Sequence, residues 1–203
     1  MGQHEGMARI VLQEFLTLDG VMQGPGSADE DPSNGFDKGG WQLGFADEAS
    51  GRFVVRHLND AAAYLLGRRT YDIFAAYWPT QDADNRIAAT MNSKPKYVVS
   101  RTLSDPLSWE NSTLINDDVV PRLRQLKSEV EGDIVVIGSG DLSQTLMENE
   151  LVDEYRLMVF PVVLGEGKRL FRDVDATRRL RLTDSTISNT GVLLLSYAPE
   201  PAG

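Results

Sequence analysis

The sequence predicts an α/β domain built on a mixed, mostly parallel sheet that ends in an antiparallel hairpin. Between residues 9 and 160, runs of strand-forming residues alternate with segments of helical spacing, and this alternation favours parallel strands with helices on both faces of the sheet. After residue 160 two further strands follow without a helix between them, which indicates an antiparallel edge.

In the first half of the chain, an apolar, extended segment at residues 9–17 predicts the first strand. Residues 18–44 are rich in Gly, Pro, Asp and Ser and predict a long loop, which in a compact domain is usually functional or mobile. The segments that follow predict, in order, a helix at 45–59, a strand at 62–66, and short helices at 70–77 and 82–91.

In the second half, Tyr97, Val98 and Val99 are strand formers and predict a strand at 96–100. No linker or repeat interrupts the pattern, so we expect one domain over residues 9–199, a disordered lead at 1–8 and a tail at 200–203. The remaining segments predict strands at 113–116, 133–137 and 154–160, helices at 117–130 and 141–150, and two last strands at 179–186 and 192–198.

The composition excludes several classes of function. The 203 residues include no cysteine, which excludes disulfides, thiolate zinc sites, iron–sulfur clusters and cysteine nucleophiles, and the pattern suggests no metal site. The net charge of −10 disfavours nucleic acid and anionic membranes as partners. No apolar run approaches the ~20 residues of a membrane helix, and we expect a cytoplasmic protein.

Three predicted strands end in segments that suit an anion. The carboxyl ends of parallel strands lie along one edge of the sheet, where α/β folds bind ligands. Glycine lets the backbone approach a phosphate closely, and a helix that begins there offers free N–H groups. The segments are Gly67-Arg68-Arg69-Thr70 after the strand at 62–66, Ser100-Arg101-Thr102 after residues 97–99, and Gly138-Ser139-Gly140-Asp141 after 133–137.

The arginines of these segments indicate a bound anion more specifically than the glycines do. A cation at a helix N-terminus opposes the helix dipole at a cost of roughly 0.3–1 kcal/mol, and a bound anion would reverse that effect. Arg68, Arg69 and Arg101 are therefore candidates for contact with the 2′-phosphate that distinguishes NADP from NAD. The alternative is that Gly67 only ends a strand, that Thr70 caps a helix, and that the arginines are solvated.

Five segments in this order resemble the dihydrofolate reductase superfamily. The resemblance is narrowest to stand-alone relatives of the C-terminal reductase domain of bifunctional riboflavin-biosynthesis deaminase/reductase proteins. This chain has no cysteine for the zinc deaminase domain of those proteins. The segments are Thr17-Leu18-Asp19-Gly20, Leu65 to Tyr71 with Tyr77-Trp78-Pro79, Val98 to Leu103, Ile137 to Leu142, and Pro161 to Phe171.

The resemblance implies a three-layer α/β/α fold with about eight strands and NADPH along the strand ends. It also implies that residues 17–20 begin a loop that closes over the nicotinamide and the substrate, and that the protein is a homodimer. The cofactor-binding residues that it implies are Thr17, Gly20, Gly67, Arg68, Arg69, Thr70, Ser100, Arg101, Gly138, Ser139, Gly140, Asp141 and Leu142.

The function that this resemblance implies is an NADPH-dependent reduction of a small pyrimidine or pterin-like compound. The leading candidate is the ribosylaminopyrimidine of riboflavin synthesis. Dihydrofolate and a nucleotide-binding module without turnover remain alternatives. Asp47, Glu48 and Asp19 are the candidate proton donors. Gly165-Glu166-Gly167-Lys168 reads as a flexible loop, or as a contact to a substrate phosphate.

Overall fold

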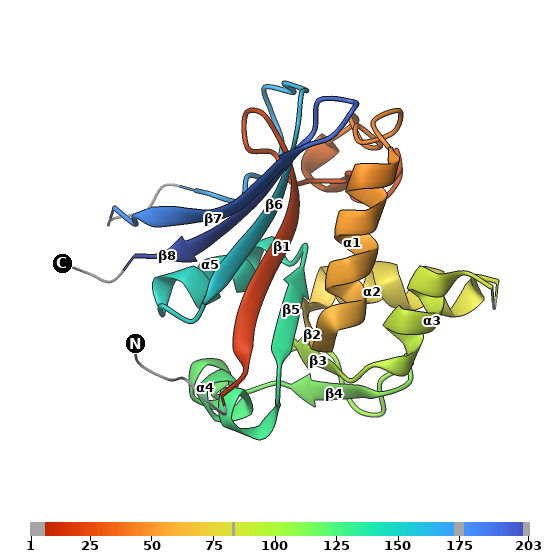
Figure 1. Ribbon diagram of the computed structural model, residues 1–203. Helices are drawn as coiled ribbons and strands as arrows, with labels where there is room; N and C mark the ends of the chain where they lie inside the picture. Colours follow the sequence, from red (N-terminus) through yellow and green to blue (C-terminus); the bar gives the residue numbers. More distant parts are fainter. Residues whose placement is uncertain (1–6, 83, 173–176, 201–203) are drawn as a thin grey trace. The chain divides into compact units, whose positions relative to one another are not determined.

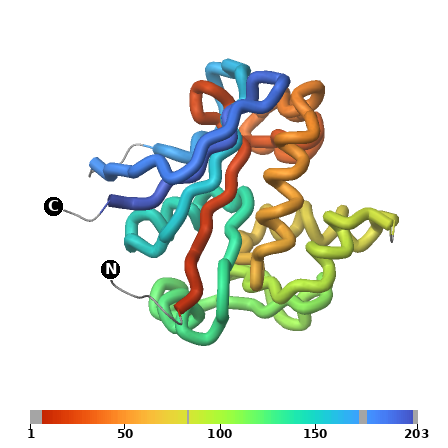
Figure 2. The backbone as a smooth tube through the Cα atoms, in the orientation of Figure 1, coloured from red at the N-terminus to blue at the C-terminus, as the bar shows by residue number. Residues whose placement is uncertain are grey.

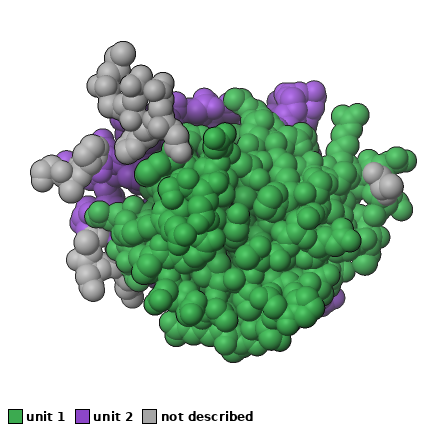
Figure 3. Space-filling model, turned by 90° about the horizontal axis from the view of Figure 1, so that it is seen from below, with its two compact units in different colours: residues 1–11, 55–153 green, residues 12–54, 154–203 purple. Residues whose placement is uncertain are grey.

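The computed structural model describes residues 7–82, 84–172 and 177–200. Most of the predicted lead and the end of the predicted tail therefore lie outside the described residues. The chain divides into two compact units, which Figure 3 shows in two colours. Unit 1 comprises Met1–Val11 and Val55–Asp153, and unit 2 comprises Leu12–Val54 and Glu154–Gly203. Within the described ranges, no helix has the length and apolar character to span a membrane.

Eight strands form a mixed sheet in the order β4-β3-β2-β5-β1-β6-β8-β7. The predicted α/β class is confirmed, with eight strands, helices around the sheet and an antiparallel C-terminal hairpin. Figure 1 labels these elements. The strands are β1 (Arg9–Thr17), β2 (Ala61–Gly67), β3 (Lys96–Val99), β4 (Ser112–Ile115), β5 (Asp133–Ile137), β6 (Glu154–Phe160), β7 (Leu180–Ile187) and β8 (Leu193–Pro199).

In unit 1, β2, β3, β4 and β5 are parallel, and the central strands β2 and β5 are almost fully buried. β2 lies between β3 and β5 and pairs with both, so that Leu65 is in register with Tyr97 on one side and Val136 on the other. Residues 63–66 of β2 are all buried, as expected for a parallel strand that is covered on both faces. The carboxyl ends of β2, β3 and β5 therefore lie at one edge of the sheet, as the sequence predicts.

The helices differ from the prediction mainly where they begin. The helix predicted from residue 45 begins at Glu48, because Asp47 and Ser50 cap it. The helix predicted from residue 82 begins at Arg86, because the Asn85 Oδ1 accepts hydrogen bonds from the backbone N–H groups of its first turn. The helices are α1 (Glu48–Asp60), α2 (Arg68–Tyr77), α3 (Arg86–Ser93), α4 (Val119–Glu129) and α5 (Gly140–Glu148), with 3-10 turns η1 (Ser33–Gly35) and η2 (Trp78–Thr80).

Unit 2 has an aromatic core around Phe160. The rings of Phe15, Trp41 and Phe45 meet Phe160 edge to face, with centroids 6.0, 5.4 and 5.9 Å from it. Such pairs add about 0.5–1.5 kcal/mol each beyond the area that they bury. Because Trp41 and Phe45 belong to the segment after β1, this core fixes the long loop in place. The chain path of the loop and of the β7–β8 hairpin can be followed in Figure 2.

Candidate functional site

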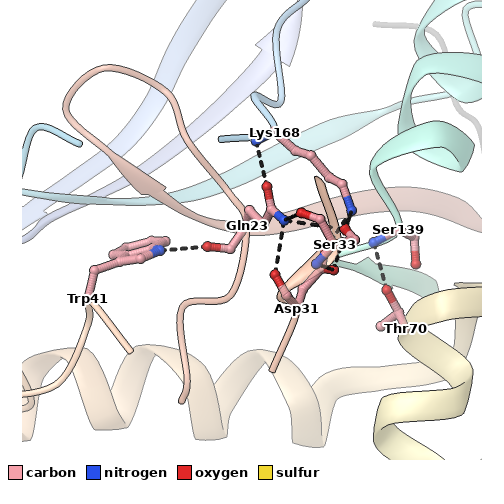
Figure 4. Close-up of polar contacts among 7 residues, drawn as sticks. All are labelled: Gln23, Asp31, Ser33, Trp41, Thr70, Ser139 and Lys168. Carbon is pink, nitrogen blue, oxygen red and sulfur yellow. Dashed lines mark hydrogen bonds and ion pairs between the residues drawn. The ribbon is translucent and has the colours of Figure 1, made fainter. Parts of the chain in front are cut away.

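The segments after β2 and β5 are joined by hydrogen bonds in unit 1. The backbone N–H of Gly67 donates to the Ser139 Oγ at 2.9 Å. The backbone N–H of Ser139 donates to the Thr70 Oγ1 at 2.9 Å, as Figure 4 shows. These two hydrogen bonds bring together two of the three predicted anion-binding segments. Thr70 is not a helix cap, because α2 begins at Arg68 with Gly67 as its N-cap.

The turn after β5 depends on glycine. Gly138 has a φ of 58° and Ser139 a φ of 61°, a left-handed conformation that glycine adopts without steric cost. A Cβ atom on Gly138 would lie 2.9 Å from the Thr70 Oγ1. The sequence Gly138-Ser139 is therefore required for α5 to begin this close to α2.

The helices α2 and α5 both begin at this edge, and neither N-terminus has a side-chain cap. Neither Gly67 of α2 nor Ser139 of α5 makes a side-chain capping hydrogen bond. The first backbone N–H groups of a helix have no partner within the helix, and they attract phosphate through hydrogen bonds and the helix dipole. The geometry therefore suits the oxygens of a pyrophosphate.

Three exposed arginines surround this edge of unit 1. Arg68, Arg69 and Arg101 are all exposed. The Arg68 guanidinium pairs with Asp72, with 3.3 Å between Nε and Oδ2, and it also donates to the Thr102 Oγ1. Arg68 thus links the start of α2 to the segment after β3. Their exposure leaves these guanidinium groups accessible to a phosphate.

Other residues assigned to the cofactor have structural contacts of their own. Ser100 is buried, and its Oγ accepts hydrogen bonds from the N–H groups of Thr102 and Leu103 at 3.2 and 3.1 Å. Leu142 is 7% exposed, within the core. Asp141 lies exposed in the first turn of α5, where a carboxylate is favourable to the helix dipole. Ser100 and Leu142 shape the loops more than they offer contact surface.

In unit 2, Thr17, Asp19 and Gly20 form a tight turn at the end of β1. The Thr17 Oγ1 donates to the Asp19 Oδ1 at 2.7 Å and accepts from the Val21 N–H at 2.9 Å. Gly20 has a φ of 81°. Thr17 is 1% exposed, so its side chain supports the turn from inside.

Asp19 fastens this turn to the segment after β6. Its carboxylate accepts hydrogen bonds from the N–H groups of Leu164 and Gly165 and lies 3.4 Å from the Arg169 Nη2. Burial raises the pKa of Asp19, but the hydrogen bonds from Thr17 and from these backbone groups outweigh it and lower the pKa to about 2. Asp19 is therefore ionised at neutral pH, and its geometry does not favour a role as proton donor.

Asp47 and Glu48 are engaged at the start of α1. The Asp47 Oδ1 accepts from the Ser50 N–H at 2.8 Å, and Oδ2 accepts from the Asn189 N–H at 2.7 Å. The hydrogen bonds from Ser50 and Asn189 lower the pKa of Asp47 to about 2. Glu48 is exposed and pairs with Arg52 one turn along the helix. Neither side chain has the environment of a general acid, because Asp47 is an N-cap and Glu48 is a surface ion pair.

Lys168, Asp31, Ser33 and Gln23 form a polar cluster in unit 2 that the sequence does not reveal (Figure 4). The Lys168 Nζ lies 2.6 Å from both the Asp31 Oδ2 and the Ser33 Oγ. The Gln23 side chain accepts from the Lys168 N–H at 3.0 Å and donates to the backbone oxygens of Asp31 and Ser33. The segment around Lys168 is thus tied to the long loop at several points, which explains why this part of the chain needs lysine.

The pKa of the Glu30 carboxyl is raised above its ordinary value. Burial is the largest cause, and the charge of Asp31 adds to it, whereas hydrogen bonds from the N–H groups of Gly26 and Ser27 oppose the shift. The sequence does not single out Glu30, because a glutamate in a polar loop belongs to no periodic or motif pattern that would predict its burial. The pKa values of Asp19, Asp31 and Asp47 are lowered, whereas that of Glu30 is shifted in the direction that favours the protonated carboxyl.

The chain matches the model of the family described as the RibD C-terminal domain over residues 8–194. Among curated proteins, it is 33% identical over 197 residues to the uncharacterized protein YyaP of Bacillus subtilis (strain 168), covering 93% of this chain and 94% of that protein.

Two solved structures are similar in fold. A putative riboflavin biosynthesis protein from Shewanella sp. PV-4 has a TM-score of 0.67 at 19% identity, covering 95% of this chain and 99% of that chain. A dihydrofolate reductase from Enterococcus faecalis complexed with NADP(H) has a TM-score of 0.61 at 12% identity, covering 96% and 98%. Together with the family match, these likenesses confirm the resemblance that the five segments carry: the chain belongs to the RibD C-terminal domain family, on a dihydrofolate-reductase-like fold.

Proposed function

We propose that this protein is an NADPH-dependent reductase of a small heterocyclic metabolite, of the type found in riboflavin biosynthesis. The observation that carries the proposal is the pair of uncapped helix starts at α2 and α5, joined through Ser139 and Thr70. Exposed arginines surround this pair. Membership of the RibD C-terminal domain family supports the same reading.

The residues of unit 1 fit a phosphorylated dinucleotide. The helix starts at Arg68 and Gly140 supply backbone N–H groups for the pyrophosphate. Arg68, Arg69 and Arg101 supply guanidinium groups for the 2′-phosphate, because arginine binds phosphate through two parallel hydrogen bonds. That the fold neighbour from Enterococcus faecalis is complexed with NADP(H) supports this choice of cofactor.

Such a cofactor supplies the hydride, and the protein supplies binding, orientation and exclusion of water. In this chain the loop at residues 21–44 is held by Lys168 and by the aromatic core of unit 2. We propose that this loop reads the substrate. Glu30 lies within it and is our candidate for the group that protonates the substrate, in place of Asp47, Glu48 and Asp19.

The proposed substrate is a pyrimidine of the kind that precedes riboflavin, 5-amino-6-(5-phosphoribosylamino)uracil. Dihydrofolate reduction is the alternative within the same reaction class, and NADP binding without turnover is the alternative outside it. A cytoplasmic location and a homodimer also remain predictions from the sequence and the resemblance.

A thermal-shift titration with NADPH and NADH side by side tests the cofactor. Ligand at a hundredfold excess over its Kd stabilises the folded state by about 2.7 kcal/mol. We expect a clear shift with NADPH and a smaller one with NADH, and an Arg68→Ala/Arg69→Ala variant should lose that difference. Arg52→Ala, an exposed arginine of α1, is the matched control. No shift with either nucleotide would overturn the cofactor assignment.

The substrate is tested separately, by the loss of nicotinamide absorbance when NADPH is mixed with the pyrimidine or with dihydrofolate. Turnover of the pyrimidine alone supports the proposal, and turnover of dihydrofolate alone supports the alternative. A protein that binds NADPH but consumes it with neither compound would favour the binding module.

A further inference from the structure

Lys96, the first residue of β3, is a fully buried lysine outside the contacts described above. Its exposed fraction is 0%, although a lysine is almost never fully buried unless its charge has partners. The Lys96 Nζ donates to the backbone oxygens of Met91, Asn92 and Lys94 at 3.0, 3.1 and 2.9 Å. An ammonium group has three N–H donors, so one donor is available for each of these oxygens.

These acceptors lie at the end of α3. The last carbonyl groups of a helix have no partner within the helix, and the helix dipole favours a cation beside them. Met91 and Asn92 belong to the last turn of α3, and Lys94 follows as its C-cap. Lys96 therefore caps α3 with its side chain while its backbone belongs to β3, which fixes the end of the helix to the sheet.

The Lys96 ammonium also contacts Trp109. Its Nζ lies 4.3 Å from the centroid of the Trp109 ring, and such cation–π contacts are strongest where the groups are desolvated. Trp109 is itself only 3% exposed, and its indole N–H donates to the Asn92 Oδ1 at 2.7 Å. Burial lowers the pKa of Lys96 to about 8, and the charge of Glu110 opposes this shift, so that the charged form prevails at neutral pH.

Trp109 in turn contacts the first turn of α2. Its backbone N–H donates to the Tyr71 Oη at 2.9 Å, and the two rings pack with their centroids 6.3 Å apart. Tyr71 is buried and directly follows Thr70, whose hydroxyl accepts a hydrogen bond from Ser139 in the candidate cofactor site. Trp109 therefore connects the buried lysine to the helix start that we assign to the cofactor phosphates.

Trp109 is also the last residue of the segment that carries Arg101. We call this segment, residues 100–109, the β3 loop. Its first backbone N–H donates to a backbone oxygen of β4 at 3.0 Å. Between these two fixed ends, Arg101 and Thr102 are exposed, and the Thr102 Oγ1 accepts a hydrogen bond from the Arg68 guanidinium. The contacts of Trp109 thus limit how far the β3 loop can move relative to α2.

We propose that Lys96 is a positioning residue of the candidate cofactor site. By holding Trp109 against α3 and α2, it keeps the β3 loop where Arg101 and Arg68 can bind one phosphate together. Groups that are held in place before binding lose less conformational entropy when the ligand arrives, so the contribution of these arginines to NADPH affinity depends on the buried contact. This inference rests on the proposed function, because it concerns the preference for NADPH over NADH.

Nucleotide selectivity tests the proposal. We titrate folded wild type and Lys96→Met with NADPH and NADH in a calorimeter, and we expect the variant to lose roughly tenfold in NADPH affinity but to stay within about twofold for NADH. Lys94→Met is the matched control, because its ammonium donates to the backbone oxygens of Asn59 and Ala61, and it should keep the wild-type selectivity. Equal losses for both nucleotides in Lys96→Met, or unchanged affinities, would overturn the proposal.

Limited digestion with trypsin separates this inference from the proposed function, because it needs no nucleotide. Arg101 is an exposed cleavage site within the β3 loop. We expect cleavage after Arg101 to be roughly tenfold faster in Lys96→Met than in the wild type, and unchanged in Lys94→Met. Equal rates would show that Lys96 does not hold the loop. Faster cleavage in a protein that binds neither nucleotide would overturn the proposed function, and the role of Lys96 in cofactor binding with it.

Tyr71→Phe keeps the test decisive if Lys96→Met fails to fold. The change removes only the hydroxyl that accepts the Trp109 N–H. We expect it to weaken NADPH binding severalfold without a change for NADH, and to speed cleavage after Arg101. Tyr77→Phe, at an exposed tyrosine of the same helix, is the control and should behave as the wild type does. A Tyr71→Phe variant with wild-type selectivity and wild-type cleavage would overturn the proposal.

Discussion

The backbone N–H of Ser139 donates to the Thr70 Oγ1 across 2.9 Å, although 69 residues separate them in the chain. This bond holds the turn after β5 against the first turn of α2. Both turns lead into helices whose first N–H groups are candidates for phosphate binding. The affinity for NADPH should therefore depend on a residue whose hydroxyl is already occupied by the protein.

Thr70→Val removes the acceptor of this bond while keeping the shape of the side chain. An N–H group left without a partner costs about 1–3 kcal/mol, and we expect a comparable loss of stability. NADPH affinity should fall by roughly tenfold, which corresponds to about 1.4 kcal/mol. Thr70→Ser keeps the hydroxyl and is the control. Isothermal titration of both variants with NADPH measures the effect, and equal affinities would show that the bond does not position the site.

Gly138→Ala tests the close approach of the two turns. The added Cβ would lie 2.9 Å from the Thr70 Oγ1, in a residue whose φ is 58°. We expect destabilisation of about 1–3 kcal/mol from the strained backbone, measured by urea unfolding. Gly51→Ala in α1 is the control, because a Cβ there meets nothing within 4 Å, and this change should be neutral or stabilising by up to about 1 kcal/mol.

The strand ends were predictable because parallel pairing and the positions of Gly67 and Gly138 depend on local pattern. The roles of the carboxylates were not. Asp47 becomes a cap only once α1 is known to begin at Glu48. From the sequence alone, Lys168 is predicted to belong to a flexible loop. In the fold its Nζ lies 2.6 Å from the Oδ2 of Asp31, which is 137 positions away in the chain. Contacts of this range leave no periodic signal in one sequence.

Lys168→Met tests whether this cluster orders the loop at residues 21–44. The change removes the ammonium group that pairs with the largely buried carboxylate of Asp31, and we expect a loss of about 1–3 kcal/mol in the free energy of unfolding. Lys168→Met/Asp31→Asn should recover part of that loss, because an uncharged amide then replaces the carboxylate that Lys168 neutralises. Lys38→Met, at a more exposed ion pair, should cost less than about 1 kcal/mol. If Lys168→Met and Lys38→Met lowered the free energy of unfolding equally, the cluster would not order the loop more than a surface ion pair does.

Glu30→Gln tests the proposed proton donor. The amide keeps the size of the side chain but cannot supply a proton, and we expect the turnover rate to fall by about 10²–10⁴-fold while the Kd for NADPH stays within twofold of the wild type. Asp47→Asn, which alters a helix cap, should change stability more than turnover. Single-turnover kinetics with the accepted substrate measure the first effect. Unchanged turnover in Glu30→Gln would exclude this carboxyl as the acid.

Asp19→Asn should lower stability in a pH-dependent way. The pKa of Asp19 is about 2 in the folded protein, against an ordinary value of 3.8. Because the folded-state pKa is depressed, the unfolded chain takes up a proton before the folded protein does as the pH falls. The stabilisation is therefore complete above about pH 4.8 and is lost progressively as the pH falls toward 2. Urea unfolding of wild type and variant should give a clear difference at pH 7 that shrinks at pH 3. A difference that is constant over this range would mean that the ionised carboxylate does not hold the segment after β6 through Leu164 and Gly165.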